Sequence, residues 1–497
     1  MLFLRQYFYI CPNAILLGPT EILLLIVAYF VVLVGISFLT QKSGSNEEFF
    51  KANNKSPWYL VAFGMIGASL SGVTFISIPG TVETSGFSYF QVVLGYTIGY
   101  AVISLVLLPL YYKLQLTSIY TYLEQRYGFY AYKTGASFFL LSRIVGASFR
   151  LFLVAGVLQL IVFNELHIPF YITVTITISL IWVYTFKSGI KTIVWTDSLQ
   201  TLFMLISLGV SIVLLMHDMD ISFSGISDYL ETQETFKMFF FEDWHSGDFF
   251  FKQFISGAFI AIVMTGLDHG MMQKNLTCPN LKDAQKNIFS FTIILTIVNF
   301  LFLFLGLLLT DYANSNGISA EKDDLFPAIA MSGDLALAVS IFFLLGLIAA
   351  AYSSADSALT SLTTSFSIDI LNIEKRYPKA RQVKVRKMTH VGVSLVLILT
   401  MLLFEYAIQD KSVINKLFQF AGYTYGPLLG LFALGMFTKW KIKDRFIPIV
   451  AVLSPILSFL ISWICSEWFN FEFGFFILIL NGFLTFLGLV LIRVKHN

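Results

Sequence analysis

The sequence has few charged residues and almost no cysteine. Only 12% of its 497 residues are charged, whereas soluble domains carry about a quarter. Apolar residues make up 57% of the chain, and its mean hydropathy is +0.77. This composition excludes an ordinary soluble domain and predicts an all-α polytopic membrane protein. The three cysteines, Cys11, Cys278 and Cys465, are too few and too scattered for a disulfide framework or a zinc site.

The signatures of several other function classes are also missing. The chain contains no His-Glu-x-x-His or Gly-x-Ser-x-Gly pattern, which argues against an intramembrane enzyme. No repeated ring of polar groups marks a channel pore. No stretch between apolar segments is long enough for a soluble domain, so we expect the function to lie within the helix bundle.

About thirteen apolar segments of membrane-spanning length follow one another along the chain. They lie near residues 21–40, 58–80, 88–114, 133–163, 168–186, 192–216, 251–273, 288–310, 335–361, 388–408, 412–438, 446–466 and 473–494. Most of the loop lysines and arginines fall on one side if the N-terminus is outside, with a dense group between Lys375 and Lys387. The pattern predicts an outside N-terminus and a cytoplasmic C-terminus. We expect the membrane to be a bacterial inner membrane.

One apolar segment, which begins near Leu335, ends in a polar cluster. Ala350, Ser353, Ser354 and Ser357 follow helical spacing and share one face. Two hydroxyls and a free carbonyl on that face are hard oxygen ligands for a small cation. Small polar residues also let membrane helices pack closely, which is the simpler interpretation. Asp356 favours the functional one, because an ionisable group inside a spanning helix is costly.

The second segment is a weak helix former in its middle. Gly67, Ser69, Ser71 and Gly72 lie at the depth where a continuous helix would be rich in leucine. We predict a break near residues 70–72, which would free backbone carbonyls to line a cavity or bind an ion. The alternative is an unbroken, glycine-rich packing face.

Four further ionisable residues lie within predicted spans. Asp197 and Asp268 are near the inner ends of two segments, where solvation at the interface is also open to them. Arg143 and Arg150 are seven residues apart and therefore lie on the same helical face. A buried arginine requires an anion. For Arg143 a protein carboxylate and a substrate carboxylate are both open, whereas for Arg150 we expect a structural ion pair or a snorkelling side chain.

Several motifs, taken in order, resemble the sodium/solute symporter family, which includes sodium-coupled sialic acid, galactose, proline and monocarboxylate carriers. One of them contains Trp195-Thr196-Asp197. Together they lie at residues 48–50, 56–58, 117–128, 189–200, 266–274, 353–354 and 423–430.

The resemblance implies a core of two inverted five-helix repeats whose first helix is broken. It divides the chain into an N-terminal extra helix and linker (1–57), a first repeat (58–216), an extracytoplasmic loop (217–250), a second repeat (251–440) and two C-terminal helices (441–497).

The resemblance also implies a sodium site. Its ligands would be the carbonyls of Gly67, Leu70 and Ala350 and the hydroxyls of Ser353 and Ser354.

A second cation position is implied as well, because some members of the family have one. It would be formed by Asp197, Ser353, Asp356 and Ser357. Asp356 departs from the serine found there in sialic acid carriers, and the added charge would strengthen a second cation site or bind a proton instead.

The family's substrate site implies Ser69, Ser71, Thr74 and Gln91 as contacts, with Arg143 pairing a substrate carboxylate. We therefore expect a sodium-coupled symporter of a small polar organic solute, an organic anion such as a sialic acid or another carboxylate, that works by alternating access. A carrier of sugars or other neutral solutes, a proton-driven carrier and a sensor that binds solute without moving it are the alternatives. The expected partners are the solute, Na⁺ and the lipid bilayer, with neither nucleic acid nor an obligate oligomer.

Overall fold

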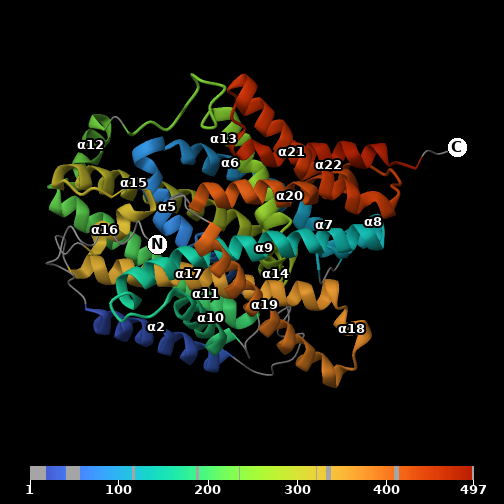
Figure 1. Cartoon of the computed structure of the whole chain (residues 1–497), viewed down its shortest axis with the longest axis horizontal. Helices are drawn as coiled ribbons and strands as arrows, with labels where there is room; N and C mark the ends of the chain where they lie inside the picture. The colour runs from blue at the N-terminus through green and yellow to red at the C-terminus, as the bar shows by residue number, and fades with distance from the viewer. Residues whose placement is uncertain are drawn as a thin grey trace.

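The computed structural model describes residues 18–40, 56–114, 118–185, 190–233, 235–320, 322–331, 337–407 and 413–494. Within these ranges the regular structure is helical, apart from an isolated bridge between Ile442 and Arg493. Figure 1 shows long helices packed side by side into one bundle. Residues 41–55, which belong to the predicted N-terminal linker, lie outside the described residues. The predicted all-α class is confirmed.

Within the described residues, ten helices are long and apolar enough to cross a membrane, and up to twelve spans result if each of two bent helix pairs counts as one. A shorter apolar helix, α10 (Phe170–Thr185), lies between two of them. The count of thirteen spans stays a prediction. The ten long helices correspond to α2 (Pro19–Thr40), α6 (Ser88–Val102) continued by α7 (Leu108–Leu114), α9 (Phe129–Leu158), α11 (Ile190–Asp218), α15 (Leu281–Asn316), α17 (Leu337–Ser365), α19 (Lys379–Ala407), α20 (Val413–Phe437), α21 (Ile447–Phe469) and α22 (Ile477–Leu491).

The predicted break in the second span is present. Helix α4 (Trp58–Ser69) and helix α5 (Gly72–Ser85) meet at an angle of 58°. Between them Leu70 and Ser71 have extended backbones, with ψ angles of 119° and 176°. The chain therefore leaves the helix where its weak helix formers lie, and α5 begins a new helical N-terminus in the interior of the bundle.

A second break, which we did not predict, lies in the seventh span. Helix α13 (Phe250–Ala261) continues through a π-helical turn to Gly266 and then turns by 72° into α14 (His269–Asn275). Asp268 caps the N-terminus of α14, because its Oδ1 accepts a hydrogen bond of 3.0 Å from the backbone N–H of Met271. The first span of each predicted repeat is thus broken, in agreement with an inverted pair of repeats.

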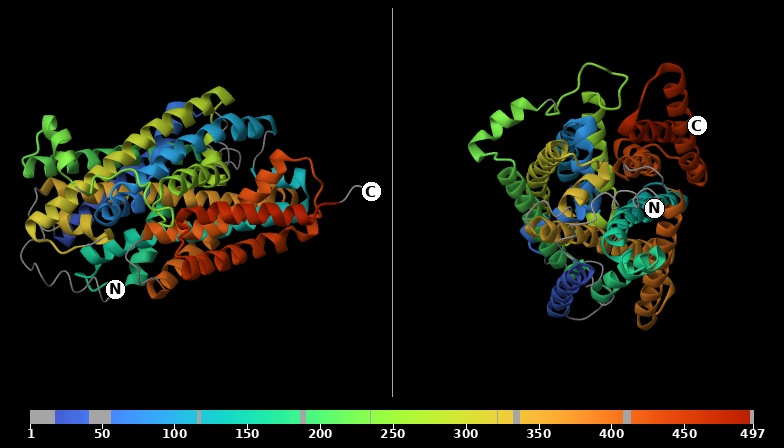
Figure 2. Two further views of the ribbon diagram at one scale, coloured as in Figure 1. Left: turned by 90° about the horizontal axis from the view of Figure 1, so that it is seen from above. Right: turned by 60° about the vertical axis from the view of Figure 1, so that its left-hand side comes forward.

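Helix α17 passes through the middle of the bundle and brings the two breaks together. It packs against α4, α5, α9, α11 and α14. Figure 2 shows α2 (blue) at one edge of the bundle and α21 with α22 (red) at another, away from this centre. The central helices therefore enclose the polar residues, and the flanking helices face outward on the bundle's edges.

Candidate functional site

The residues of the predicted sodium site lie around the first break and on α17. Gly67 comes so close to its neighbours that a Cβ atom there would lie 2.3 Å from Thr201 Oγ1 and 3.1 Å from Ser353 Oγ. Its backbone N–H donates to Thr201 Oγ1 over 2.9 Å. The glycine therefore allows α4, α11 and α17 to meet at one point, beside the carbonyls that the break releases.

The two serines of α17 are suited to a small cation. Ser353 and Ser354 are buried. The Ser353 hydroxyl donates to Asp197 Oδ1 over 2.8 Å, which leaves its oxygen lone pairs to act as ligands. The Ser354 hydroxyl is buried and makes no hydrogen bond to any described residue. A buried polar group without a partner is costly, and a sodium ion would satisfy it. The residues present therefore fit Na⁺.

Next to these serines lies a buried ion pair that the sequence did not suggest. Lys274 Nζ is 2.5 Å from Asp197 Oδ2 and 2.7 Å from Ser357 Oγ. Lys274 is 1% exposed and Asp197 is fully buried. Because Lys274 follows an apolar segment, the sequence favours an inside-loop position for it, but α14 places it inside the bundle. Its ammonium lies between two of the residues that we predicted for the second cation.

Asp356, the remaining member of that predicted position, belongs to the same polar cluster. It is fully buried on α17. The Ser357 hydroxyl lies 3.3 Å from Asp356 Oδ1 and 3.4 Å from Asp197 Oδ2. Two carboxylates therefore approach one hydroxyl, and the ammonium of Lys274 contacts that hydroxyl as well.

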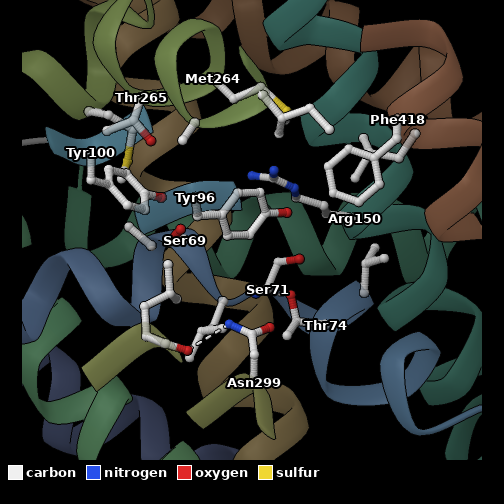
Figure 3. Close-up of a pocket in the computed structure, with 18 of the residues that line it drawn as sticks. Ser69, Ser71, Thr74, Tyr96, Tyr100, Arg150, Met264, Thr265, Asn299 and Phe418 are labelled. Atoms are coloured by element: carbon white, nitrogen blue, oxygen red, sulfur yellow. Dashed lines mark hydrogen bonds between the residues drawn. The ribbon is translucent and has the colours of Figure 1, made fainter. Parts of the chain in front are cut away.

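A cavity lies beside the first break and contains most of the predicted substrate contacts. It encloses about 690 Å³ of space not filled by atoms, open mouth included. Ser69, Ser71, Thr74 and Arg143 all line it. Figure 3 shows Ser69, Ser71 and Thr74 on the chain around the break, facing aromatic side chains that include Tyr96, Tyr100 and Phe418.

Gln91 is the predicted contact that the structure keeps away from this cavity. It is fully buried, and its Nε2 donates to the backbone carbonyl of Asp248 over 2.9 Å. Its Oε1 accepts from the backbone N–H of Phe240 over 3.0 Å. Both ends of the amide are therefore used to fix the 217–250 segment against α6.

The two arginines of α9 have different surroundings. Arg143 Nη1 lies 3.5 Å from Asp268 Oδ2, and both side chains are buried. The hydroxyl of Tyr425 donates to the same oxygen over 3.0 Å. The protein itself therefore supplies the anion for Arg143. Arg150 also lines the cavity, and its Nε is buried without a hydrogen bond to a described residue.

These features define a helical membrane transporter with a broken helix next to a polar cavity. The model of the sodium:solute symporter family matches residues 49–443. The chain therefore belongs to this family of transporters, for which Na⁺ is the coupling ion.

Two curated relatives match this chain over nearly their full length. The chain is 25% identical to the sodium/sialic acid symporter NanT of Aliivibrio fischeri, over 92% of this chain and 90% of the relative. It is 26% identical to the sodium/sialic acid symporter SiaT of Proteus mirabilis, over 89% of each chain.

Solved structures agree with the fold. A Na⁺-coupled sialic acid symporter in a substrate-bound outward-open state superposes with a TM-score of 0.79 at 19% identity, covering 95% of this chain and 97% of the other. Mhp1, a transporter of the nucleobase-cation-symport-1 family, gives a TM-score of 0.55 at 14% identity, over 90% and 96% of the two chains. At these identities the likeness speaks for the fold alone.

Proposed function

We propose that the protein imports a small polar organic anion, such as a sialic acid or another carboxylate, together with Na⁺ by alternating access. The observation that carries the proposal is the Ser354 hydroxyl on α17, which is buried beside the break between α4 and α5 and makes no hydrogen bond to a described residue. The names of the two full-length relatives support a carboxylate as the solute, as does a cavity lined by two arginines.

The sodium ion would tie the broken helix to α17. Its proposed ligands are the carbonyls of Gly67, Leu70 and Ala350 and the hydroxyls of Ser353 and Ser354. A bound ion holds the break in the form that shapes the neighbouring cavity, so ion and solute each raise the affinity for the other. Each inward charge contributes about 2.3 kcal/mol per 100 mV of membrane potential.

At the second cation position we propose that the ammonium of Lys274 balances Asp197. A fixed positive charge there makes a second sodium ion unnecessary, because the carboxylate is already paired and hydrogen-bonded. One Na⁺ per solute then suffices for transport. The full ligand set that the sequence implied, namely Asp197, Ser353, Asp356 and Ser357, would bind an ion only if Lys274 moved away.

A proton-driven carrier is the second candidate, and buried Asp356 is the residue that favours it. Transport of a sugar or another neutral solute by the same fold is a further alternative. The proposal also includes an N-terminus outside, a C-terminus in the cytoplasm of a bacterium, and two repeats at residues 58–216 and 251–440.

Uptake into proteoliposomes tests the proposal. Radiolabelled N-acetylneuraminate is offered with an inward gradient of Na⁺, or with choline in its place, at fixed pH on both sides. The proposal expects uptake with Na⁺ and little with choline. Equal uptake in choline, together with stimulation by an inward proton gradient, would favour the proton-driven alternative. Counterflow of labelled solute separates a carrier from a sensor that binds without transport.

A further inference from the structure

We infer that Arg150, rather than Arg143, binds the anionic group of the transported solute. The inference rests on the proposed function and names the residue that recognises the negative charge. The two side chains are seven residues apart on α9 and both reach the cavity, so the question is which guanidinium is free to take an anion.

Arg143 is already paired. Its Nη1 faces Asp268 Oδ2 at 3.5 Å, and the side chains are 7% and 0% exposed. Asp268 is held in place by the hydroxyl of Tyr425 and by the backbone N–H of Met271. A solute carboxylate at Arg143 would have to compete with a buried carboxylate that these two hydrogen bonds fix in position. Separating that pair would leave Asp268 buried without its cation, which is strongly unfavourable.

Arg150 has no such partner. None of the ion pairs between described residues includes it. Its Nε is buried and makes no hydrogen bond to a described residue, which is also true of Nε and Nη2 of Arg143. The difference between the two arginines is therefore the ion pair of Arg143 with Asp268. Asp268 can balance only one of the two arginines, so a positive charge remains in the middle of the bundle. Such a charge needs an anion.

The cavity supplies the setting for that anion. No aspartate or glutamate is among the described residues that line it. Figure 3 shows the guanidinium of Arg150 extending into the cavity above Ser71 and Thr74, beside the ring of Tyr96. Ser71 and Thr74 lie at the N-terminus of α5, where the helix dipole adds to the positive potential. The guanidinium of Arg150 and the N-terminus of α5 therefore both add positive potential to the same part of the cavity.

The chemistry indicates the class of solute. A guanidinium binds a carboxylate through two parallel hydrogen bonds, which a neutral solute cannot accept equally well. The remaining wall offers hydroxyls from Ser71, Thr74 and Tyr96 and an aromatic face from Phe418. This lining fits a monocarboxylate whose body carries hydroxyl or amide groups on one side and an apolar surface on the other.

Equilibrium binding tests the inference. Purified full-length wild-type protein and the Arg150→Gln and Arg150→Lys variants are titrated at saturating Na⁺ with N-acetylneuraminate, gluconate and pyruvate, and with the neutral solutes N-acetylmannosamine and glucose. We expect Arg150→Gln to weaken the binding of carboxylates by at least tenfold and the binding of neutral solutes by less than twofold. Arg150→Lys keeps the charge without the planar fork, so its carboxylate affinity should lie between those of the wild-type protein and Arg150→Gln.

Two controls separate this inference from the proposed function. Thermal stabilisation by Na⁺ without solute should be unchanged in Arg150→Gln, because no sodium ligand is altered; its loss would mean that the variant has lost its fold. Lys237→Gln, which removes an exposed charge outside the cavity, should leave carboxylate affinity unchanged.

Unaltered carboxylate affinity in Arg150→Gln would overturn the inference while leaving sodium symport intact. A wild-type protein that binds none of the three carboxylates at saturating Na⁺ would overturn it as well. Absence of any Na⁺ effect in the wild-type protein would instead contradict the proposed function.

Discussion

The ammonium of Lys274 lies 2.5 Å from the carboxylate of Asp197, and both side chains are buried. The lysine comes from the short helix that follows the second break, and the aspartate comes from α11. Ser353 and Ser357 of α17 hydrogen-bond to the same carboxylate. This pair therefore links the second break to α11 and to α17, the helix that carries the two serines of the proposed sodium site.

Replacing Lys274 by methionine should turn the predicted second cation position into a working one. The substitution leaves Asp197 buried without its cation, which costs about 3–5 kcal/mol, and Na⁺ can relieve that cost. We expect lower thermal stability without Na⁺, a larger stabilisation by Na⁺ than in the wild-type protein, and a higher Hill coefficient for Na⁺ in uptake.

The double variant Lys274→Met/Asp197→Asn is the matched control. It has neither charge, so the added Na⁺ response should disappear and part of the lost stability should return. A Hill coefficient that stays at the wild-type value in the single variant, with unchanged stabilisation by Na⁺, would show that no second cation enters at Asp197.

Ser353 and Ser354 should respond differently to replacement by alanine. Ser354 makes no hydrogen bond to a described residue, so Ser354→Ala should lower Na⁺ affinity at least tenfold with little change in Na⁺-free stability. Ser353→Ala also removes the hydrogen bond to Asp197, which is worth about 1.5–3 kcal/mol. The double variant should insert and fold but show no Na⁺-dependent uptake.

Na⁺-dependent thermal shifts and initial uptake rates measure both effects. Thr438→Ala serves as a control, because among the described residues its hydroxyl contacts only nearby backbone, donating to the carbonyl of Leu434 and accepting from the N–H of Trp440. If the double variant took up solute with the wild-type dependence on Na⁺, the assignment of the sodium ligands would be wrong.

The sequence predicted the first break but not the second, for a physical reason. Gly67, Ser69, Ser71 and Gly72 weaken a helix in the middle of an apolar segment, where a break is the natural interpretation. In the second break, Asp268 comes at the end of an apolar segment, where an acidic residue looks like an ordinary interfacial one. Its role as the N-terminal cap of a new helix depends on the 72° turn.

The burial of Lys274 was beyond sequence reasoning for a related reason. A lysine after an apolar run is typical of a cytoplasmic flank, and only the fold carries it back inside. The sequence also could not predict the partners of Arg143 and Gln91. Each depends on a segment distant in the chain, Asp268 for the arginine and the 217–250 segment for the glutamine. Local patterns placed ionisable residues in the bundle but could not pair them.

Gly67→Ala should impair sodium coupling through a steric effect. The added Cβ would lie 2.3 Å from Thr201 Oγ1, so α4 must move away from α11, at a cost of about 1–3 kcal/mol. We expect Na⁺ affinity to fall severalfold, because the Gly67 carbonyl is a proposed ligand. Adding Thr201→Ala removes the clashing oxygen. Recovery of Na⁺ affinity in the double variant, measured against Thr201→Ala alone, distinguishes a clash from a loss of helix flexibility.

Asp248 should make stability depend on pH at the N-terminal end of α6. Burial raises the pKa of this carboxyl above its usual range, with hydrogen bonds from Ser88 and Gln253 opposing the shift. A raised folded-state pKa means that the protonated form is favoured in the folded protein. The contribution to stability is therefore fully present below the unfolded pKa and is lost as pH rises through the folded pKa.

Asp248→Asn should remove this dependence, because the amide cannot ionise and its Oδ1 can still accept from Gln253. Relative to the wild-type protein, the variant should gain stability as pH rises from 4 to 7 (roughly the range over which a carboxyl with a raised pKa titrates). Thermal unfolding across this range measures the difference between the two proteins. A difference that stays constant with pH would mean that the Asp248 carboxyl titrates alike in the folded and unfolded chains, so that burial does not disfavour its charge.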